Sequence, residues 1–183
     1  ILKQMDISHD ISLFYINNNQ NSYDVKNTYS NGIQGSNYSS GLFLNNESQI
    51  AIGIQKSLFS NSVKLVAVLV HELCHYKLLY ELKLSENDEE LTDLLTIFFG
   101  YGFFSSDSCF EYKMVQESNS YTWSVSKSGY LSDYMYGYII YIRDAIFQKK
   151  DSCYSILPPN VKDSYSKTKK YFRKYPIADF IKY

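Results

Sequence analysis

Cysteine, histidine and proline are scarce in this chain, and long apolar runs are missing. Each of the three residue types occurs only three times among 183 residues. An odd number of widely spaced cysteines does not form a disulfide framework. No segment reaches the roughly 18 consecutive apolar residues that a membrane-spanning helix needs, and no signal peptide is visible. We therefore expect no membrane partner and a cytoplasmic location.

The chain also has almost no net charge. Its 18 basic and 19 acidic residues give a formal charge of −1, so no global electrostatic field favours nucleic acid. A basic segment near the C-terminus, residues 161–175, is most simply the solvated face of a helix, and we expect no nucleic-acid partner. Hydrophobic residues make up 45% and charged residues 20% of the sequence, which is usual for a globular domain with a real core.

Two of the three histidines stand four residues apart in the sequence His71-Glu72-Leu73-Cys74-His75. This HExxH motif closes an apolar run that predicts a buried helix. Residues four apart share one face of a helix, so both imidazoles can reach one metal ion. Glu72 would lie beside a water on that ion, as the general base does in zinc hydrolases. We interpret Cys74 as a small buried residue rather than a ligand.

The HExxH pattern also occurs by chance in amphipathic helices. There the histidines lie on the surface, or in the core with hydrogen-bond partners for their ring nitrogens. The preceding segment, Lys64 to Val70, is nearly all apolar. Two histidines and a glutamate at the end of such a buried segment would be costly to desolvate without a partner. We therefore expect a zinc ion held by His71 and His75, with Glu72 as the catalytic base.

A catalytic zinc takes a third protein ligand and leaves one position for water. The segment from Asp88 to Phe99 predicts a second helix, which Ser85 or Asn87 could cap. An antiparallel return would bring its acidic first turn back to the histidines. Glu89 is the expected third ligand and Glu90 its main rival; the other interpretation is a solvated helix start.

Glu89 and Asp93 are four residues apart, which is the spacing found in gluzincin metallopeptidases. There the first acid ligates zinc and the second accepts the remaining ring N–H of the first histidine. Asp93 is followed at once by leucines and phenylalanines, and a carboxylate inside an apolar helix needs a partner. We predict that Asp93 accepts that hydrogen bond from His71.

The remaining elements follow from periodicity, capping residues and turn residues. In the first half of the chain we expect a strand or helix end at 11–16, a loop at 17–41 with weak strand character near Tyr23–Tyr29, a hairpin of Leu42–Leu44 with Gln49–Gln55, and a first helix from Ser60 or Asn61 to Leu79. A second helix should run from about Asn87 to Phe99 and can continue past Gly100 to Phe104. After it we expect a loop at 105–120, a short strand at 121–125, a third helix capped by Ser132 or Asp133 and ending near Phe147, and a last helix over 161–175.

Together these elements predict an α+β fold. We expect a mainly helical, zincin-like domain with a small N-terminal antiparallel sheet packed beside the HExxH helix. Residues 1–183 would form one domain, with sheet and loops in 1–59, the metal-site helix pair in 60–104 and a C-terminal helical part in 105–183. The strand Gln49–Gln55 is either an edge strand that pairs with a substrate backbone or a plain strand that covers the core.

Several segments resemble a family of uncharacterised bacterial zinc-metallopeptidase-like proteins, and more loosely the ImmA/IrrE-type regulatory peptidases. The resemblance implies a compact gluzincin-like fold, with His71, His75 and Glu89 as ligands and Glu72 as base. It supplies no substrate, and the first 39 residues lie outside it. The matching segments are Ser40–Phe43, Ile50–Ile54, Leu65–His75, Glu89–Gly100, Gly129–Leu131, Met135–Tyr138 and Leu157–Val161.

These observations favour a zinc metallopeptidase that cleaves a protein or peptide substrate. The oxyanion of the reaction needs a further donor, and a tyrosine from the segment around Tyr130 and Tyr134 is the candidate, with Tyr136 and Tyr138 beside them. Two alternatives stay open. The first is a non-catalytic, zinc-stabilised protein-interaction module, against which the intact Glu72 argues. The second is a metal-free partner-binding protein with a tyrosine-rich surface.

Overall fold

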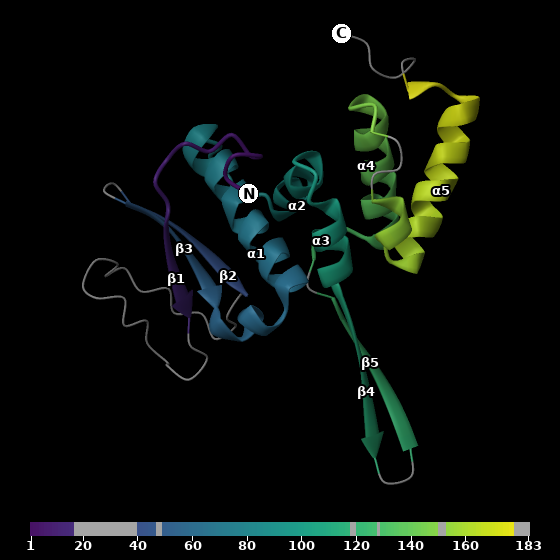
Figure 1. Cartoon of the computed structure of the whole chain (residues 1–183), viewed down its shortest axis with the longest axis horizontal. Helices are drawn as coiled ribbons and strands as arrows, with labels where there is room; N and C mark the ends of the chain where they lie inside the picture. Colours follow the sequence, from purple (N-terminus) through teal and green to yellow (C-terminus); the bar gives the residue numbers. More distant parts are fainter. Residues whose placement is uncertain (17–39, 47–48, 118–119, 128, 150–152, 178–183) are drawn as a thin grey trace. The chain divides into compact units, whose positions relative to one another are not determined.

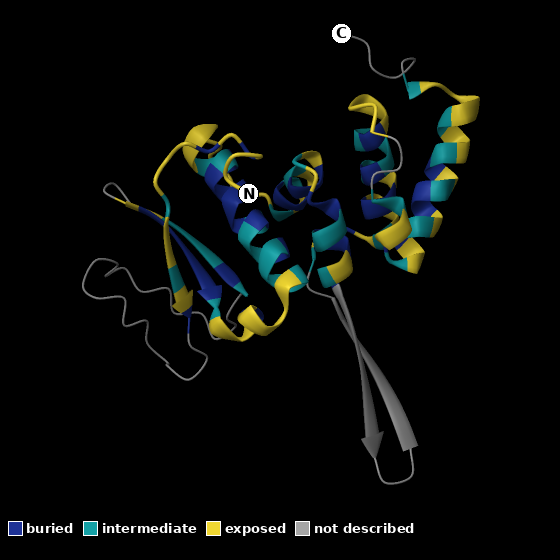
Figure 2. Cartoon of the chain, viewed as in Figure 1, coloured by how far each residue is buried: buried dark blue, intermediate teal, exposed yellow. Residues whose placement is uncertain are grey.

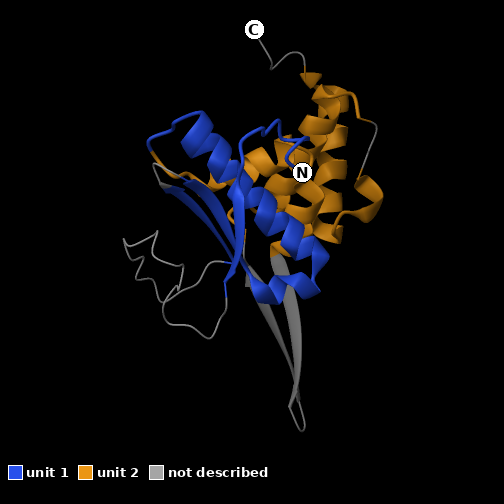
Figure 3. Ribbon diagram, turned by 60° about the vertical axis from the view of Figure 1, so that its left-hand side comes forward, with its two compact units in different colours: residues 1–85 blue, residues 86–183 orange. Residues whose placement is uncertain are grey.

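The computed structural model describes residues 1–16, 40–46, 49–117, 120–127, 129–149 and 153–177 (Figure 1). The fold is mixed α+β, as predicted. Its contacts divide the chain into two compact units, residues 1–85 and 86–183 (Figure 3). The boundary falls inside residues 60–104, which we expected to form one helix pair. The single-domain organisation therefore stays a prediction, and each unit is described by itself.

The first unit contains a three-stranded sheet of β1 (Ser12–Ile16), β2 (Gly41–Asn46) and β3 (Gln49–Gln55), in the order β1-β3-β2. The predicted hairpin is confirmed, because β2 and β3 pair antiparallel. The sheet is not wholly antiparallel, however, since β1 runs parallel to β3. A long connection separates β1 from β3, which gives the chain room for the crossover that a parallel pair requires.

Strand β3 is the centre of this sheet, and residues 50–54 are all buried (Figure 2). Its central position corrects one of our two interpretations of Gln49–Gln55, because a strand paired on both sides has no edge to offer a substrate. Ile52 lies opposite Leu13 of β1 and Phe43 of β2. The strand therefore covers the core, as the other interpretation proposed.

The motif helix α1 (Ser62–His75) follows β3 through the short 3-10 helix η1 (Lys56–Ser60). It begins where predicted, because the Asn61 side chain accepts a hydrogen bond from the Lys64 backbone N–H at 3.0 Å. The helix contacts β2 and β3, which confirms a sheet beside the HExxH helix. Its buried residues are Ala67, Val70, Glu72, Leu73, Cys74 and His75.

The second unit is mainly helical. Its core contains Ile97, Cys109, Leu131, Tyr136, Ile140, Leu157, Val161 and Tyr165. Its elements are α2 (Glu89–Phe98), α3 (Gly102–Ser108), β4 (Phe110–Glu117), β5 (Ser120–Lys127), α4 (Asp133–Ile146), the 3-10 helix η3 (Tyr154–Ile156) and α5 (Pro159–Lys174).

Helix α2 ends at Phe98, with Phe99 as its C-cap, close to the predicted end at Phe99, but its start is capped by a different residue from those predicted. Asp88 is its N-cap and accepts from the Leu91 N–H at 2.9 Å, so neither Ser85 nor Asn87 caps it. The helix does not continue to Phe104. Gly100 has a φ of 94°, a left-handed conformation that stops a helix and that glycine adopts at little cost. A separate helix, α3, follows.

Residues 105–120 were expected to be a loop, and this prediction was wrong. They include the end of α3 and the strand β4, which pairs antiparallel with β5. The sequence Phe110-Glu-Tyr-Lys-Met114 alternates apolar and charged residues, which is a strand pattern. The polar composition of residues 105–120 as a whole obscured it. The expected strand at 121–125 is confirmed as part of β5. Among the described helices, none combines the length and apolar character that crossing a membrane requires.

Candidate metal centre

The two histidines of the motif face one another on α1. Their Nε2 atoms are 3.1 Å apart, and their rings are nearly perpendicular, with centroids 4.7 Å apart. Two nitrogen ligands of one tetrahedral zinc, each about 2.0–2.1 Å from the metal, are themselves about 3.3 Å apart. The observed spacing therefore fits two ligands that share one ion. His75 is buried and His71 is partly exposed.

Glu89 belongs to the same group of side chains. One carboxylate oxygen of Glu89 and one ring nitrogen from each histidine all lie within 4.8 Å of one another. Two imidazoles and a carboxylate form one of the donor sets used by catalytic zinc sites. Glu89 is partly buried, whereas its rival Glu90 is exposed and is not a member of this group. The three residues that we predicted as ligands are thus close enough together to hold a metal ion, and their donor set is one that zinc uses.

A neighbour that the sequence analysis considered only as a helix cap restrains Glu89. Asn87 donates a hydrogen bond from its side-chain Nδ2 to Glu89 Oε1 at 2.8 Å. Because Asp88 caps the helix, the Asn87 amide is available for this contact. A carboxylate that is already restrained by a hydrogen bond loses less side-chain entropy when it binds a metal, so this contact prepares Glu89 as a ligand.

The predicted base, Glu72, is buried, with 6% of its surface exposed. It packs against Gly41, the first residue of β2. A Cβ added at residue 41 would overlap Glu72 Oε1 and would stand only 2.6 Å from Val68 Cγ1 and 2.8 Å from Glu72 Cγ. Only glycine leaves room for the carboxylate in this position. The start of β2 therefore fixes where Glu72 can lie.

The structure confirms that Asp93 is buried and that donors meet it. Asp93 is 4% exposed, and its Oδ2 accepts hydrogen bonds from the Tyr130 backbone N–H at 2.8 Å and from the Tyr136 hydroxyl at 3.3 Å. These contacts supply partners that a buried carboxylate requires. The hydrogen bond from His71 to Asp93 stays a prediction.

The four tyrosines considered as oxyanion donors are in different environments. Tyr130 and Tyr134 are 50% and 67% exposed, and Tyr138 is 41% exposed. Tyr136 is 1% exposed and its hydroxyl is bonded to Asp93, so it is not available to a substrate. Tyr136 is thereby excluded, Tyr130 and Tyr134 remain the candidates with Tyr138 beside them, and this role stays a prediction.

The motif helix does not end at His75 but changes its winding there. Residues Tyr76–Glu81 form a π-helix, η2, a rare conformation that often occurs at functional sites. The Lys77 Nζ lies 2.6 Å from Glu81 Oε2, as an ion pair, and donates a hydrogen bond to the Asp6 carbonyl oxygen at 2.8 Å. Burial, followed by the neighbouring Glu81, raises the pKa of Tyr76 to about 12. This segment anchors the C-terminal end of the motif helix within the first unit.

Comparison with known proteins adds no family. No protein-family model matches the chain, and neither the curated proteins nor the solved structures include a significant match. The family resemblance of the sequence therefore stays an expectation. What the chain does has to be inferred from its own residues.

Proposed function

We propose that this chain is a zinc-dependent hydrolase that cleaves peptide bonds, with a zincin-like active site. The observation that carries the proposal is the 3.1 Å separation of the His71 and His75 Nε2 atoms, together with a Glu89 carboxylate oxygen within 4.8 Å of them. A chance HExxH helix has no reason to place a carboxylate from another helix beside its two histidines. Zinc is the preferred ion because this mixed nitrogen and oxygen set suits it.

In this proposal the chain's own residues divide the work. His71, His75 and Glu89 bind the metal, which supplies the Lewis acidity that activates water and polarises a carbonyl group. Glu72 accepts the proton of the attacking water and delivers it to the leaving amine. The missing side chain at Gly41 leaves room for the Glu72 carboxylate in the position it occupies. An exposed hydroxyl, from Tyr130 or Tyr134, would stabilise the developing negative charge.

The position of β2 supports a peptide substrate. In the part of the chain that the structure describes, β2 pairs with β3 on one side and has no strand on the other. An extended peptide can add to such an edge through backbone hydrogen bonds. Gly41 of β2 abuts Glu72, so a peptide bound along this edge would pass close to the proposed base.

One observation favours the alternative of a non-catalytic, zinc-stabilised interaction module. Glu72 is only 6% exposed, and a general base must reach a water molecule during the reaction. A buried glutamate beside a closed metal site would serve structure alone. The alternative predicts bound zinc without hydrolysis, which makes the two functions separable by experiment.

The decisive variant is Glu72→Gln, which removes the base and retains the shape of the side chain. We expect it to bind zinc like the wild type and to lose hydrolysis by roughly 10²–10⁴-fold. The measurement is a proteome-wide search for peptides that the wild type produces and the variant does not. Glu90→Gln, an exposed change of the same kind, is the control and should cleave normally.

Two results would count against the proposed hydrolase. If Glu72→Gln cleaved the same peptides at the wild-type rate, Glu72 would not be the base. If the zinc-loaded wild type cleaved nothing, the interaction module would be the better explanation.

A further inference from the structure

Asp93 is a carboxylate in the interior of the second unit, one helical turn after Glu89 on α2. Two donors, the Tyr130 backbone N–H and the Tyr136 hydroxyl, reach the same oxygen, Oδ2. Both come from the segment around the start of α4, far from α2 in sequence. Two hydrogen bonds to one oxygen restrict rotation of the carboxylate, so Asp93 presents its other oxygen in a defined direction.

The Tyr136 hydroxyl is a permanent donor in this arrangement. Tyr136 is 1% exposed and belongs to the core of the second unit, with Ile97 and Ile140. Burial, reinforced by the negative charge of Asp93, raises the pKa of Tyr136 far above its usual value. The phenol therefore keeps its proton at every pH at which the protein works, and the carboxylate beside it accepts.

We propose that Tyr136 is a positioning residue of the metal centre, which acts through Asp93. Asp93 is the acceptor that we expect for the second ring nitrogen of His71, and such outer acceptors typically change metal affinity 10–100-fold. Tyr136 is one step further from the metal and contributes one of the hydrogen bonds that hold Asp93. Its loss should therefore weaken zinc binding by roughly 3–10-fold. This inference rests on the metal site of the proposed function, but not on hydrolysis.

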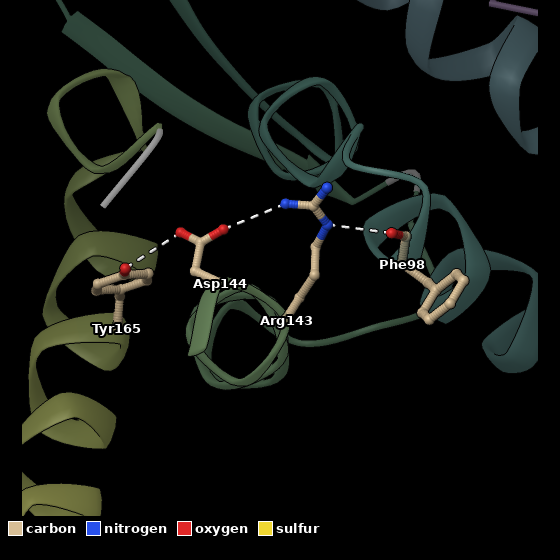
Figure 4. A network of polar contacts seen from close by, with 4 residues as sticks. All are labelled: Phe98, Arg143, Asp144 and Tyr165. Carbon is tan, nitrogen blue, oxygen red and sulfur yellow. Dashed lines mark hydrogen bonds and ion pairs between the residues drawn. The ribbon is translucent and has the colours of Figure 1, made fainter. Parts of the chain in front are cut away.

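The same unit offers a matched control in Tyr165 (Figure 4). Like Tyr136, it is 1% exposed and belongs to the same core. Its hydroxyl donates to Asp144 Oδ2 at 3.2 Å, and Arg143 Nη1 donates to the other oxygen of Asp144 at 3.2 Å. Tyr165→Phe thus removes a buried phenol–carboxylate hydrogen bond and leaves the carboxylate a second donor, as Tyr136→Phe does. Asp144, however, lies on α4 and not on the helix that carries Glu89.

The experiment compares Tyr136→Phe, Tyr165→Phe, Asp93→Ala, which removes the acceptor altogether, and the double variant Tyr136→Phe/Asp93→Ala with the wild type. Zinc affinity is measured by competition with a chromogenic chelator, and the stability of the metal-free chains by urea unfolding. Both tyrosine variants should lose similar stability, because each loses one buried hydrogen bond. Only Tyr136→Phe should lose zinc affinity. In the double variant, the Tyr136→Phe change should cause almost no further loss of zinc affinity, because Tyr136 acts through the Asp93 carboxylate.

Three results would overturn the role of Tyr136: unchanged zinc affinity in Tyr136→Phe, an equal loss in Tyr165→Phe, or full additivity in the double variant. An independent measurement needs only the wild type. Zinc should slow hydrogen exchange of the Tyr130 amide, which donates to the same oxygen, more than that of amides within α5. Equal slowing would contradict the proposal. A wild type that binds zinc without cleaving peptides would refute the hydrolase while leaving this inference intact.

Discussion

At the scale of single residues, each proposed carboxylate of the site is held by a neighbour that no motif names. Gly41 makes room for Glu72, Asn87 donates to Glu89, and Tyr136 donates to Asp93. The sequence predicted the carboxylates because helical spacing is local and readable. It could not reveal Gly41 or Tyr136, whose contacts join residues far apart in the chain. We considered Asn87 only as the N-cap of α2, and in the structure Asp88 is the N-cap.

Gly41→Ala tests whether β2 positions the base. The added methyl group would displace the Glu72 carboxylate, because Glu72 and Val68 leave no space for it. A misplacement of about 1 Å can cost on the order of 100-fold in rate, so we expect peptide cleavage to fall by roughly 10–100-fold. Zinc affinity should hardly change, since Glu72 is not a ligand. The measurements are kcat/KM on a cleaved peptide and a zinc titration.

A substitution in β2 can also act by weakening the sheet. Leu44→Ala in the same strand controls for this, because it removes packing without touching Glu72. It should lower the unfolding free energy and leave kcat/KM of the folded protein near the wild-type value. If Gly41→Ala cleaved as fast as the wild type, the contact with Glu72 would have no part in catalysis.

At the scale of elements, the caps of α1 and α4 were predicted correctly, whereas the cap of α2 and the direction of β1 were not. Asn61 and Ser132 cap α1 and α4 as predicted, because a cap depends on residues only three positions away. The break at Gly100 was left open, because glycine is compatible with both a helix and a stop until its φ is known. The parallel pairing of β1 with β3 was missed because register and direction between distant strands leave no local trace.

The first turn of α2 offers a test of ligand choice with a built-in control. Glu89 and Glu90 are adjacent acidic residues in that turn, so each interacts favourably with the helix dipole to a similar extent, about 0.3–1 kcal/mol. Glu89→Gln and Glu90→Gln should therefore cost similar stability in the metal-free chain. Only Glu89→Gln should weaken zinc binding, by roughly 100-fold or more, since it removes a charged ligand.

The two variants are compared by chelator competition and urea unfolding. The assignment of Glu89 would be wrong if Glu90→Gln lost more zinc affinity than Glu89→Gln. Equal, wild-type affinities in both variants would leave the histidine pair without a carboxylate ligand from this turn.

At the scale of the whole molecule, the chain forms two compact units, each with its own buried core. A metal that binds the folded chain and not the unfolded one adds its binding free energy to stability. Saturation at about 100 times the dissociation constant would contribute about 2.7 kcal/mol. We therefore expect the thermal midpoint of unfolding to rise with zinc in the wild type, whatever the substrate.

The most direct test of the metal centre is the zinc content and zinc affinity of the purified chain, measured together for the wild type, Glu72→Gln and His71→Ala. The wild type and Glu72→Gln should each hold about one zinc per chain, because the base is not a ligand. His71→Ala should hold none and should show no rise in the thermal midpoint on addition of zinc. A wild type without zinc, or a His71→Ala variant that binds zinc as tightly as the wild type, would contradict the metal centre and the function proposed from it.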